Sequence, residues 1–166
     1  MQAREGEHPF GAYGQKIVVL FFFAGWAGDS FLLHFFLPSK PRIPWVVHGV
    51  LVVVLFGIAS IFIIDGHRVF TQGNKAGNLI TDGTFRFTRH PGYLGRLVLF
   101  LALSLLTMSM FSLILLVFIF FYYDFLARYE EKYLYLKFGE RYLTYWKKTP
   151  KWLFFRKRLK TLGKSF

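Results

Sequence analysis

Two short polar clusters, each next to a long apolar run, contain the residues best suited to chemistry. Their members are Arg89, His90, Tyr93, Arg128, Glu130 and Glu131. Together they supply guanidinium groups, an imidazole, a phenol and a pair of carboxylates. Irregular polar backbone at a membrane boundary persists only where protein buries it or a cavity solvates it. We therefore interpret residues 81–95, which contain the first cluster, as the wall of a ligand site.

Each residue also has an ordinary structural interpretation. Arg89 and Arg128 can be snorkelling interface cations, and Asp124 is placed for an i,i+4 pair with Arg128. Glu130 and Glu131 can be solvated helix surface. The joint occurrence of both clusters with a glycine-containing turn favours the ligand site.

The composition is that of a single-domain membrane protein. The 166 residues are 54% hydrophobic, 21% aromatic and only 18% charged. The net charge of +12 is unevenly placed, because twelve of the 21 lysines and arginines lie from Arg128 onward. This placement predicts a cytoplasmic side that contacts anionic lipid head groups, and no nucleic-acid partner is expected. The absence of cysteine excludes disulfides and thiolate metal sites.

The elements that must position the clusters are apolar helices. Residues 17–37 and 45–64 are each long enough to cross a membrane. Asp29 lies inside the first span, and we expect it to be buried against a neighbouring helix in a structural role. We expect a polar cytoplasmic lead over 1–16 and a stiff external turn over the proline-rich segment 38–44.

The second half of the chain should contain a loop and a hairpin. Residues 65–93 are polar, and we expect this long segment to be the cofactor loop. Residues 97–126 are almost continuously apolar, too long for one crossing, with serines and threonines near the middle. We therefore expect spans over 94–107 and 109–127 that turn around 107–109. Four spans place both termini and the loop on the side rich in lysine and arginine, which is cytoplasmic.

Residues 128–148 are predicted to form an amphipathic cytoplasmic helix. Tyr129, Tyr133 and Leu136 recur at three- and four-residue steps, Tyr142 and Leu143 lie two such steps farther on, and Pro150 follows. The tail 151–166 has the mixture of aromatic and basic residues that is typical of an interfacial segment. The predicted fold is an all-α integral membrane protein with about four transmembrane helices and this C-terminal helix.

The clusters lie inside two patterns that resemble the isoprenylcysteine carboxyl methyltransferases. The first is Leu79-Ile80-Thr81-Asp82-Gly83-Thr84-Phe85, then Arg89-His90-Pro91-Gly92-Tyr93-Leu94-Gly95; the second is Glu130-Glu131, then Phe138-Gly139-Glu140-Arg141-Tyr142. The wider superfamily includes phospholipid N-methyltransferases and, more distantly, sterol reductases. The resemblance covers about residues 65–150, and its motifs are specific for the superfamily but not for the substrate.

The resemblance implies that S-adenosylmethionine binds in a pocket formed by both patterns. The implied cofactor contacts are Leu79, Ile80, Phe85, His90, Pro91, Gly92, Tyr93, Glu130 and Glu131. Methyl transfer from a sulfonium is an in-line displacement, so positioning matters more than acid–base catalysis. Carboxylates and aromatic rings suit a cationic donor, and Arg89 and His90 can receive its carboxylate. Arg128 and Arg89 are the candidate catalytic residues, with Arg128 orienting the acceptor.

The implied acceptor is a lipidic or prenylated molecule that arrives between helices. Prenylcysteine enzymes of the family usually carry an arginine four residues before the cofactor-binding glutamate. Here Leu126 occupies that place, and the nearest arginine is Arg128. Because Tyr129-Glu130-Glu131 also suits the lipid N-methyltransferases, the acceptor stays open between the two classes.

Other classes of function are less favoured. A metal site is not expected, because His34, His48, His67 and His90 show no close ligand spacing. An NADPH-dependent reductase of the sterol-reductase branch has a larger helical set, and no Gly-x-Gly-x-x-Gly is present. A non-catalytic membrane scaffold would leave residues 81–95 as costly polar backbone without a ligand.

Overall fold

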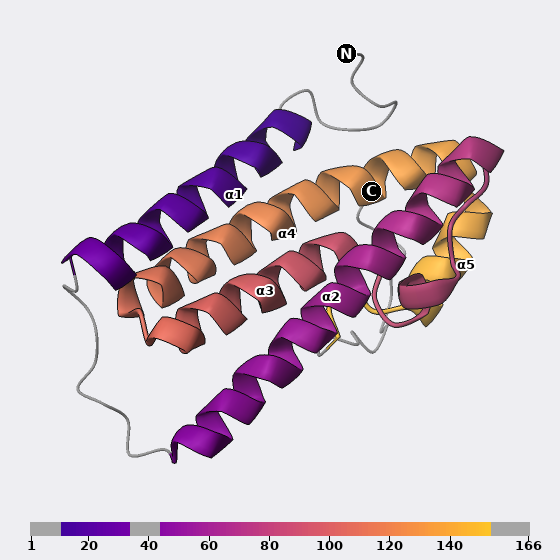
Figure 1. Ribbon diagram of the computed structural model, residues 1–166. Helices are drawn as coiled ribbons and strands as arrows, with labels where there is room; N and C mark the ends of the chain where they lie inside the picture. Colours follow the sequence, from indigo (N-terminus) through magenta and orange to yellow (C-terminus); the bar gives the residue numbers. More distant parts are fainter. Residues whose placement is uncertain (1–10, 34–43, 154–166) are drawn as a thin grey trace.

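The computed structural model describes residues 11–33 and 44–153, which are helical and contain no strand (Figure 1). The elements are α1 (Gly11–Ala27), the π-helix η1 (Gly28–Leu33), α2 (Trp45–Ala76), the 3₁₀-helix η2 (Gly83–Arg86), α3 (Pro91–Thr107), α4 (Met110–Phe138) and α5 (Glu140–Lys148). Three helical segments are long and apolar enough to cross a membrane: Tyr13–Leu33, Trp45–Gln72 and Met110–Phe138. The apolar α3 is shorter. The prediction of an all-α membrane fold is confirmed.

Several expectations fall outside the described residues. They concern the beginning of the lead (1–10), the end of the first span with His34, the proline-rich turn up to residue 43, and the tail from residue 154.

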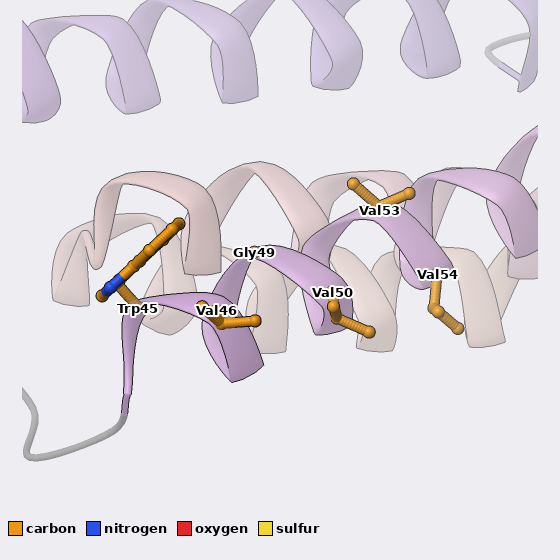
Figure 2. Close-up of a pocket in the computed structure, with 6 residues that line it drawn as sticks. All are labelled: Trp45, Val46, Gly49, Val50, Val53 and Val54. Atoms are coloured by element: carbon orange, nitrogen blue, oxygen red, sulfur yellow. The ribbon is translucent and has the colours of Figure 1, made fainter.

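The outer faces of α1 and α2 are apolar. Leu20 on α1 and Val53 on α2 are 72% and 70% exposed. A groove of about 360 Å³ on α2 is lined by Trp45, Val46, Gly49, Val50, Val53 and Val54, which Figure 2 labels. It lies at the start of α2, far from the polar clusters, and contains no polar side chain except the Trp45 indole (Figures 1 and 2). Such a surface suits contact with lipid chains.

α2 packs most extensively against α3, and two glycines allow the close approach. A Cβ atom at Gly95 would lie 2.7 Å from Ile63 Cγ1 and 3.0 Å from its backbone nitrogen. A Cβ atom at Gly66 would lie 3.3 Å from Pro91 Cβ and Cγ. The start of α3, which His90 directly precedes, is therefore packed closely against α2.

The chain turns between α3 and α4 in the segment where the hairpin turn was expected. α3 ends at Thr107, and Met108 adopts a left-handed conformation (φ 53°). Ser109 caps α4, its hydroxyl accepting a hydrogen bond from the Ser112 amide at 3.2 Å. This cap stabilises a turn that neither glycine nor proline marks.

Asp29 lies against this turn, and its predicted structural burial is confirmed. It is 4% exposed and accepts a hydrogen bond from the Ser109 hydroxyl. On α1, Phe22 is fully buried and stacks on Phe100 of α3 at 4.0 Å. The two contacts attach η1 and α1 to the α3–α4 hairpin.

Two predicted boundaries are wrong. α2 continues through Ala76, so the irregular segment begins at Gly77 rather than at residue 65. Asp65 accepts a hydrogen bond from the Thr84 amide at 2.7 Å, so the polar end of α2 is packed against the chain that follows it. The single helix expected over 128–148 is divided at Gly139 (φ 54°), which ends α4 before α5 begins.

Candidate functional site

The two polar clusters meet where α3 begins and α4 nears its end. Buried His90 precedes α3, and its Nε2 lies 3.1 Å from Glu131 Oε1. Its Nδ1 lies 3.4 Å from Glu130 Oε2. The Tyr93 hydroxyl donates a hydrogen bond to Glu130 Oε1. The carboxylate pair thus joins α4 to the first turn of α3, at the end of the bundle that also holds α5 (Figure 1).

Arg89 is the buried cation of the site. Its side chain is 8% exposed, Nη1 lies 3.2 Å from Glu131 Oε1, and the guanidinium lies over the Trp146 ring at 4.9 Å. The Glu131 contact is an ion pair without hydrogen-bond geometry, so Nε and Nη1 have no hydrogen-bond partner. Arg89 therefore has donors to spare for a ligand.

The electrostatics favour a protonated His90 and neutral phenols nearby. Burial alone lowers the pKa of His90, but hydrogen bonds to Glu130 and Glu131 and their charges outweigh it, so the pKa is raised. Burial raises the pKa of Tyr142, and the Glu131 charge adds to this effect. Burial also raises the pKa of Tyr145, against the influence of Arg89. Both phenols stay hydrogen-bond donors at neutral pH.

A short segment after α5, residues 149–152, closes over the chain that leads into α3; we call it the strap. The Arg89 amide donates to the Pro150 carbonyl at 3.0 Å, and the Thr88 hydroxyl donates to the Lys151 carbonyl at 2.7 Å. These hydrogen bonds hold the backbone of residues 88 and 89 against the strap, directly before His90.

Asp124 of α4 anchors the strap. Lys151 Nζ lies 2.6 Å from Asp124 Oδ1, and the Trp152 indole donates to the same oxygen at 3.0 Å. Trp152 is 5% exposed and lies 6.2 Å from the His90 ring. The mixture of aromatic and basic residues in 151–166 predicts an interfacial segment. It gives no sign that Lys151 and Trp152 contact Asp124 on α4.

The other predicted cofactor contacts lie in the segment that leads from α2 to η2 and in the first turn of α3. Leu79 and Ile80 are partly buried in the segment between α2 and η2. Phe85 of η2 is partly buried, and its carbonyl accepts from the Tyr145 hydroxyl at 2.8 Å. Pro91 is buried against Gly66, whereas a Cβ atom at Gly92 would meet nothing within 4 Å. Open space therefore borders the first turn of α3.

Arg128 is not brought into the cluster. Its side chain is 75% exposed, and its Nε and Nη2 donate to Asp124 Oδ2 at 2.8 and 2.5 Å. This is the i,i+4 pair that formed the ordinary interpretation of the residue.

Residues from α1 and the second turn of α3 lie beside Tyr93, at the edge of the site. Gln15 Nε2 donates to the Tyr93 hydroxyl at 3.0 Å, and Arg96 Nη1 donates to Gln15 Oε1 at 2.7 Å. Sequence reasoning missed both residues, because their contact depends on how α1 is rotated against α3.

The arrangement suits a small ligand that carries both signs of charge. Glu130 and Glu131 offer negative charge, Arg89 offers spare donors, and no His90 side-chain hydrogen bond caps the start of α3. Over residues 11–33 and 44–153, no group of three histidines or carboxylates is placed to hold a metal ion.

Comparison with known proteins identifies the family. The sequence model of the phospholipid methyltransferase family matches residues 45–141, more than half of the chain, and covers both polar clusters but not Gln15 or the strap. No curated protein and no solved structure matched the chain. The protein therefore belongs to the phospholipid methyltransferase family, within the isoprenylcysteine and phospholipid methyltransferase superfamily of integral membrane enzymes.

Proposed function

We propose that the protein transfers a methyl group from S-adenosylmethionine to an acceptor that partitions into the membrane. The acceptor is a lipid head group or an isoprenylcysteine-like carboxylate. Family membership supports methyl transfer in a membrane. The observation that carries the proposal is the contact between the carboxylate pair of α4 and the His90 and Arg89 side chains at the start of α3.

The residues of this cluster fit S-adenosylmethionine. The Glu130 side chain is 28% exposed and that of Glu131 15%, so Glu130 is the more accessible partner for a cationic group. The spare donors of Arg89 suit a carboxylate. Gly92 leaves room for close approach, and Leu79, Ile80 and Phe85 supply apolar contacts for the adenosine part.

When bound, S-adenosylmethionine supplies an electrophilic methyl group on a sulfonium centre. The task of the protein is then to position and shield, since an in-line displacement requires aligned reactants. The Tyr93 hydroxyl orients the Glu130 carboxylate, while His90 and Arg89 hold Glu131. Trp146 and Trp152 cover the cluster with apolar rings, which limits the access of water.

We further propose that the site faces the cytoplasm, with both chain termini on the same side. The site end carries basic side chains, which agrees with the positive-inside rule: Arg86, Lys132, Lys137, Arg141, Lys147, Lys148 and Lys151. The same charges suit contact with anionic lipid head groups. Arg128, exposed where α4 leaves its apolar stretch, is placed to meet an acceptor head group if it releases Asp124.

The test is a methyl-transfer assay with labelled S-adenosylmethionine, with N-acetyl-S-farnesylcysteine and phosphatidylethanolamine as separate acceptors. We expect Glu130→Ala to abolish cofactor binding and transfer, and Arg128→Ala to keep cofactor binding but reduce turnover. Glu140→Ala, which removes an exposed carboxylate of α5, serves as the matched control. Full activity of Glu130→Ala would remove that residue from the cofactor site.

A further inference from the structure

Arg96 is a cation whose charge has no described counterpart. It is the only charged residue of α3, and it lies in the second turn, between Gly95 and Leu97 in the sequence. Arg86, Arg89 and Arg128 each pair with a carboxylate, but Arg96 has no carboxylate within ion-pair distance among residues 11–33 and 44–153. A charge in such a setting is costly and indicates a functional role.

The contacts that Arg96 does make are with neutral groups. Nη1 donates to Gln15 Oε1 at 2.7 Å, and the guanidinium lies 5.8 Å from the centre of the Tyr93 ring. An amide and a phenol ring stabilise the position of a guanidinium without neutralising it. Most of its five donors remain for another partner.

A second donor without a partner stands beside Arg96. Tyr123 of α4 is fully buried, and its hydroxyl lies next to the Arg96 guanidinium and interacts with it, but no described residue accepts the proton of that hydroxyl. The ring of Tyr123 stacks on that of Tyr93 at 4.9 Å. Since Tyr93 also donates to Glu130, these donors lie next to the proposed cofactor site, on its membrane side.

We propose that Arg96, together with the Tyr123 hydroxyl, binds the anionic oxygen group of the methyl acceptor. A planar guanidinium matches the paired oxygens of a carboxylate or a phosphodiester. The acceptor is therefore an amphiphile that carries an anionic oxygen group, with its apolar chain along the helices and that group in contact with Arg96. This inference rests on the proposed function, and it gives Arg96 the contact with the anionic group of the acceptor, in addition to the role proposed for Arg128.

The proposal predicts a binding preference that one substitution removes. Binding is measured in an uncharged detergent with four probes: N-acetyl-S-farnesylcysteine, its uncharged amide, a short-chain phosphatidylethanolamine and the matching diacylglycerol. The proteins are the wild type, Arg96→Gln, Arg96→Lys, Tyr123→Phe and, as a matched control, Arg68→Gln, which removes an exposed arginine of α2. S-adenosylhomocysteine binding is measured for each protein in parallel.

Two probes carry an anionic oxygen group, the carboxylate of N-acetyl-S-farnesylcysteine and the phosphodiester of the zwitterionic phosphatidylethanolamine, and these are the anionic probes. We expect the wild type to bind at least one of them more tightly than its counterpart without that group. Arg96→Gln should weaken that binding roughly tenfold or more, because hydrogen bonds to a charged group are lost. Arg96→Lys should restore part of the affinity, and Tyr123→Phe should lose a smaller part. Affinity for the uncharged probes and for S-adenosylhomocysteine should not change. The anionic probe that responds shows whether the acceptor group is a carboxylate or a phosphodiester.

Equal affinity of Arg96→Gln and Arg68→Gln for both anionic probes would overturn the inference. If Arg96→Gln does not fold, Tyr123→Phe decides, since unchanged anionic binding there also overturns it. Binding of an anionic probe that depends on Arg96, in a wild type that binds no S-adenosylhomocysteine, would support the inference and contradict the proposed function. The two claims therefore fail separately.

Discussion

The two ends of the helical bundle both bury polar side chains, but among the described residues only one end provides hydrogen-bond partners for all of them. At the α3–α4 turn, Asp29 accepts from Ser109, while Ser30 and Trp26 donate to the Thr107 hydroxyl at 2.8 and 3.0 Å. None of these side chains has a buried atom without a partner. Such a closed network holds α1 against the hairpin.

The opposite end contains the described buried atoms that lack a hydrogen-bond partner. They are Thr84 Oγ1, Arg89 Nε and Nη1, and the hydroxyls of Tyr123 and Tyr142. Buried polar groups normally have hydrogen-bond partners. Several unpaired donors at this end therefore indicate that a bound ligand supplies the missing partners. We infer from this difference that the network at the α3–α4 turn stabilises the fold, whereas the network around Arg89 has hydrogen-bond donors available for a ligand.

The largest expected effect comes from removing the buried cation of the open end. Arg89→Ala should weaken S-adenosylhomocysteine binding about 30-fold or more, because the partner of a buried carboxylate is lost. Arg86→Ala is the control, since its ion pair with Asp82 is exposed. Calorimetric affinities measure the difference, and equal values for the two variants would contradict the role of Arg89.

Removing the anchor of the strap should affect both stability and binding. Asp124→Ala leaves Lys151 and the Trp152 indole without their acceptor, which should cost about 2–3 kcal/mol. Cofactor affinity should also fall, because the strap holds the Arg89 backbone. Thermal unfolding and calorimetry test this, with Asp82→Ala as the exposed control. Unchanged cofactor affinity in Asp124→Ala would contradict the claim that the strap supports cofactor binding.

The closed end should respond in stability alone. Asp29→Ala removes the acceptor of the Ser109 hydroxyl and should lower the free energy of unfolding by about 1–2 kcal/mol. Affinity for S-adenosylhomocysteine should equal that of the wild type. Ser60→Ala, which removes an exposed hydroxyl bonded to its own helix, should change neither property. Loss of cofactor affinity in folded Asp29→Ala would contradict the division between the two ends.

The smallest expected effect is a pH dependence at His90. Its pKa is raised above the ordinary value of 6.5, so the folded protein favours the protonated imidazole. The stabilisation is complete below that value and is lost as the pH rises through the pKa of the folded state. The difference in Tm between the wild type and His90→Gln should therefore shrink as the pH is raised from 6. A Tm difference that grows as the pH rises would contradict a raised pKa of His90 in the folded state.

The sequence predicted what depends on local pattern. Apolar runs predicted the helices, and the polar residues between Ser104 and Ser112 predicted the hairpin turn. The two family patterns predicted that His90 lies close to Glu130 and Glu131. The break at Gly139 also had a local signal, since glycine commonly ends helices.

The remaining features depend on how helices are rotated and packed. Gln15, Arg96 and Trp152 reach the site only because α1 and the strap lie against α3 and α4. No spacing in the chain predicts these contacts, as the partners are far apart in sequence. Arg128 differs from these residues, because its local i,i+4 pair with Asp124, which the spacing had offered, holds it outside the cluster.

Titration of the protein in nanodiscs with S-adenosylhomocysteine, and in parallel with NADPH, tests the central claim most directly. Saturable micromolar binding of S-adenosylhomocysteine alone, lost in Glu130→Ala, is the result that the proposed cofactor site predicts. Binding of NADPH instead would indicate a reductase. A folded wild type that binds neither compound would contradict the claim and favour a scaffold without catalytic function.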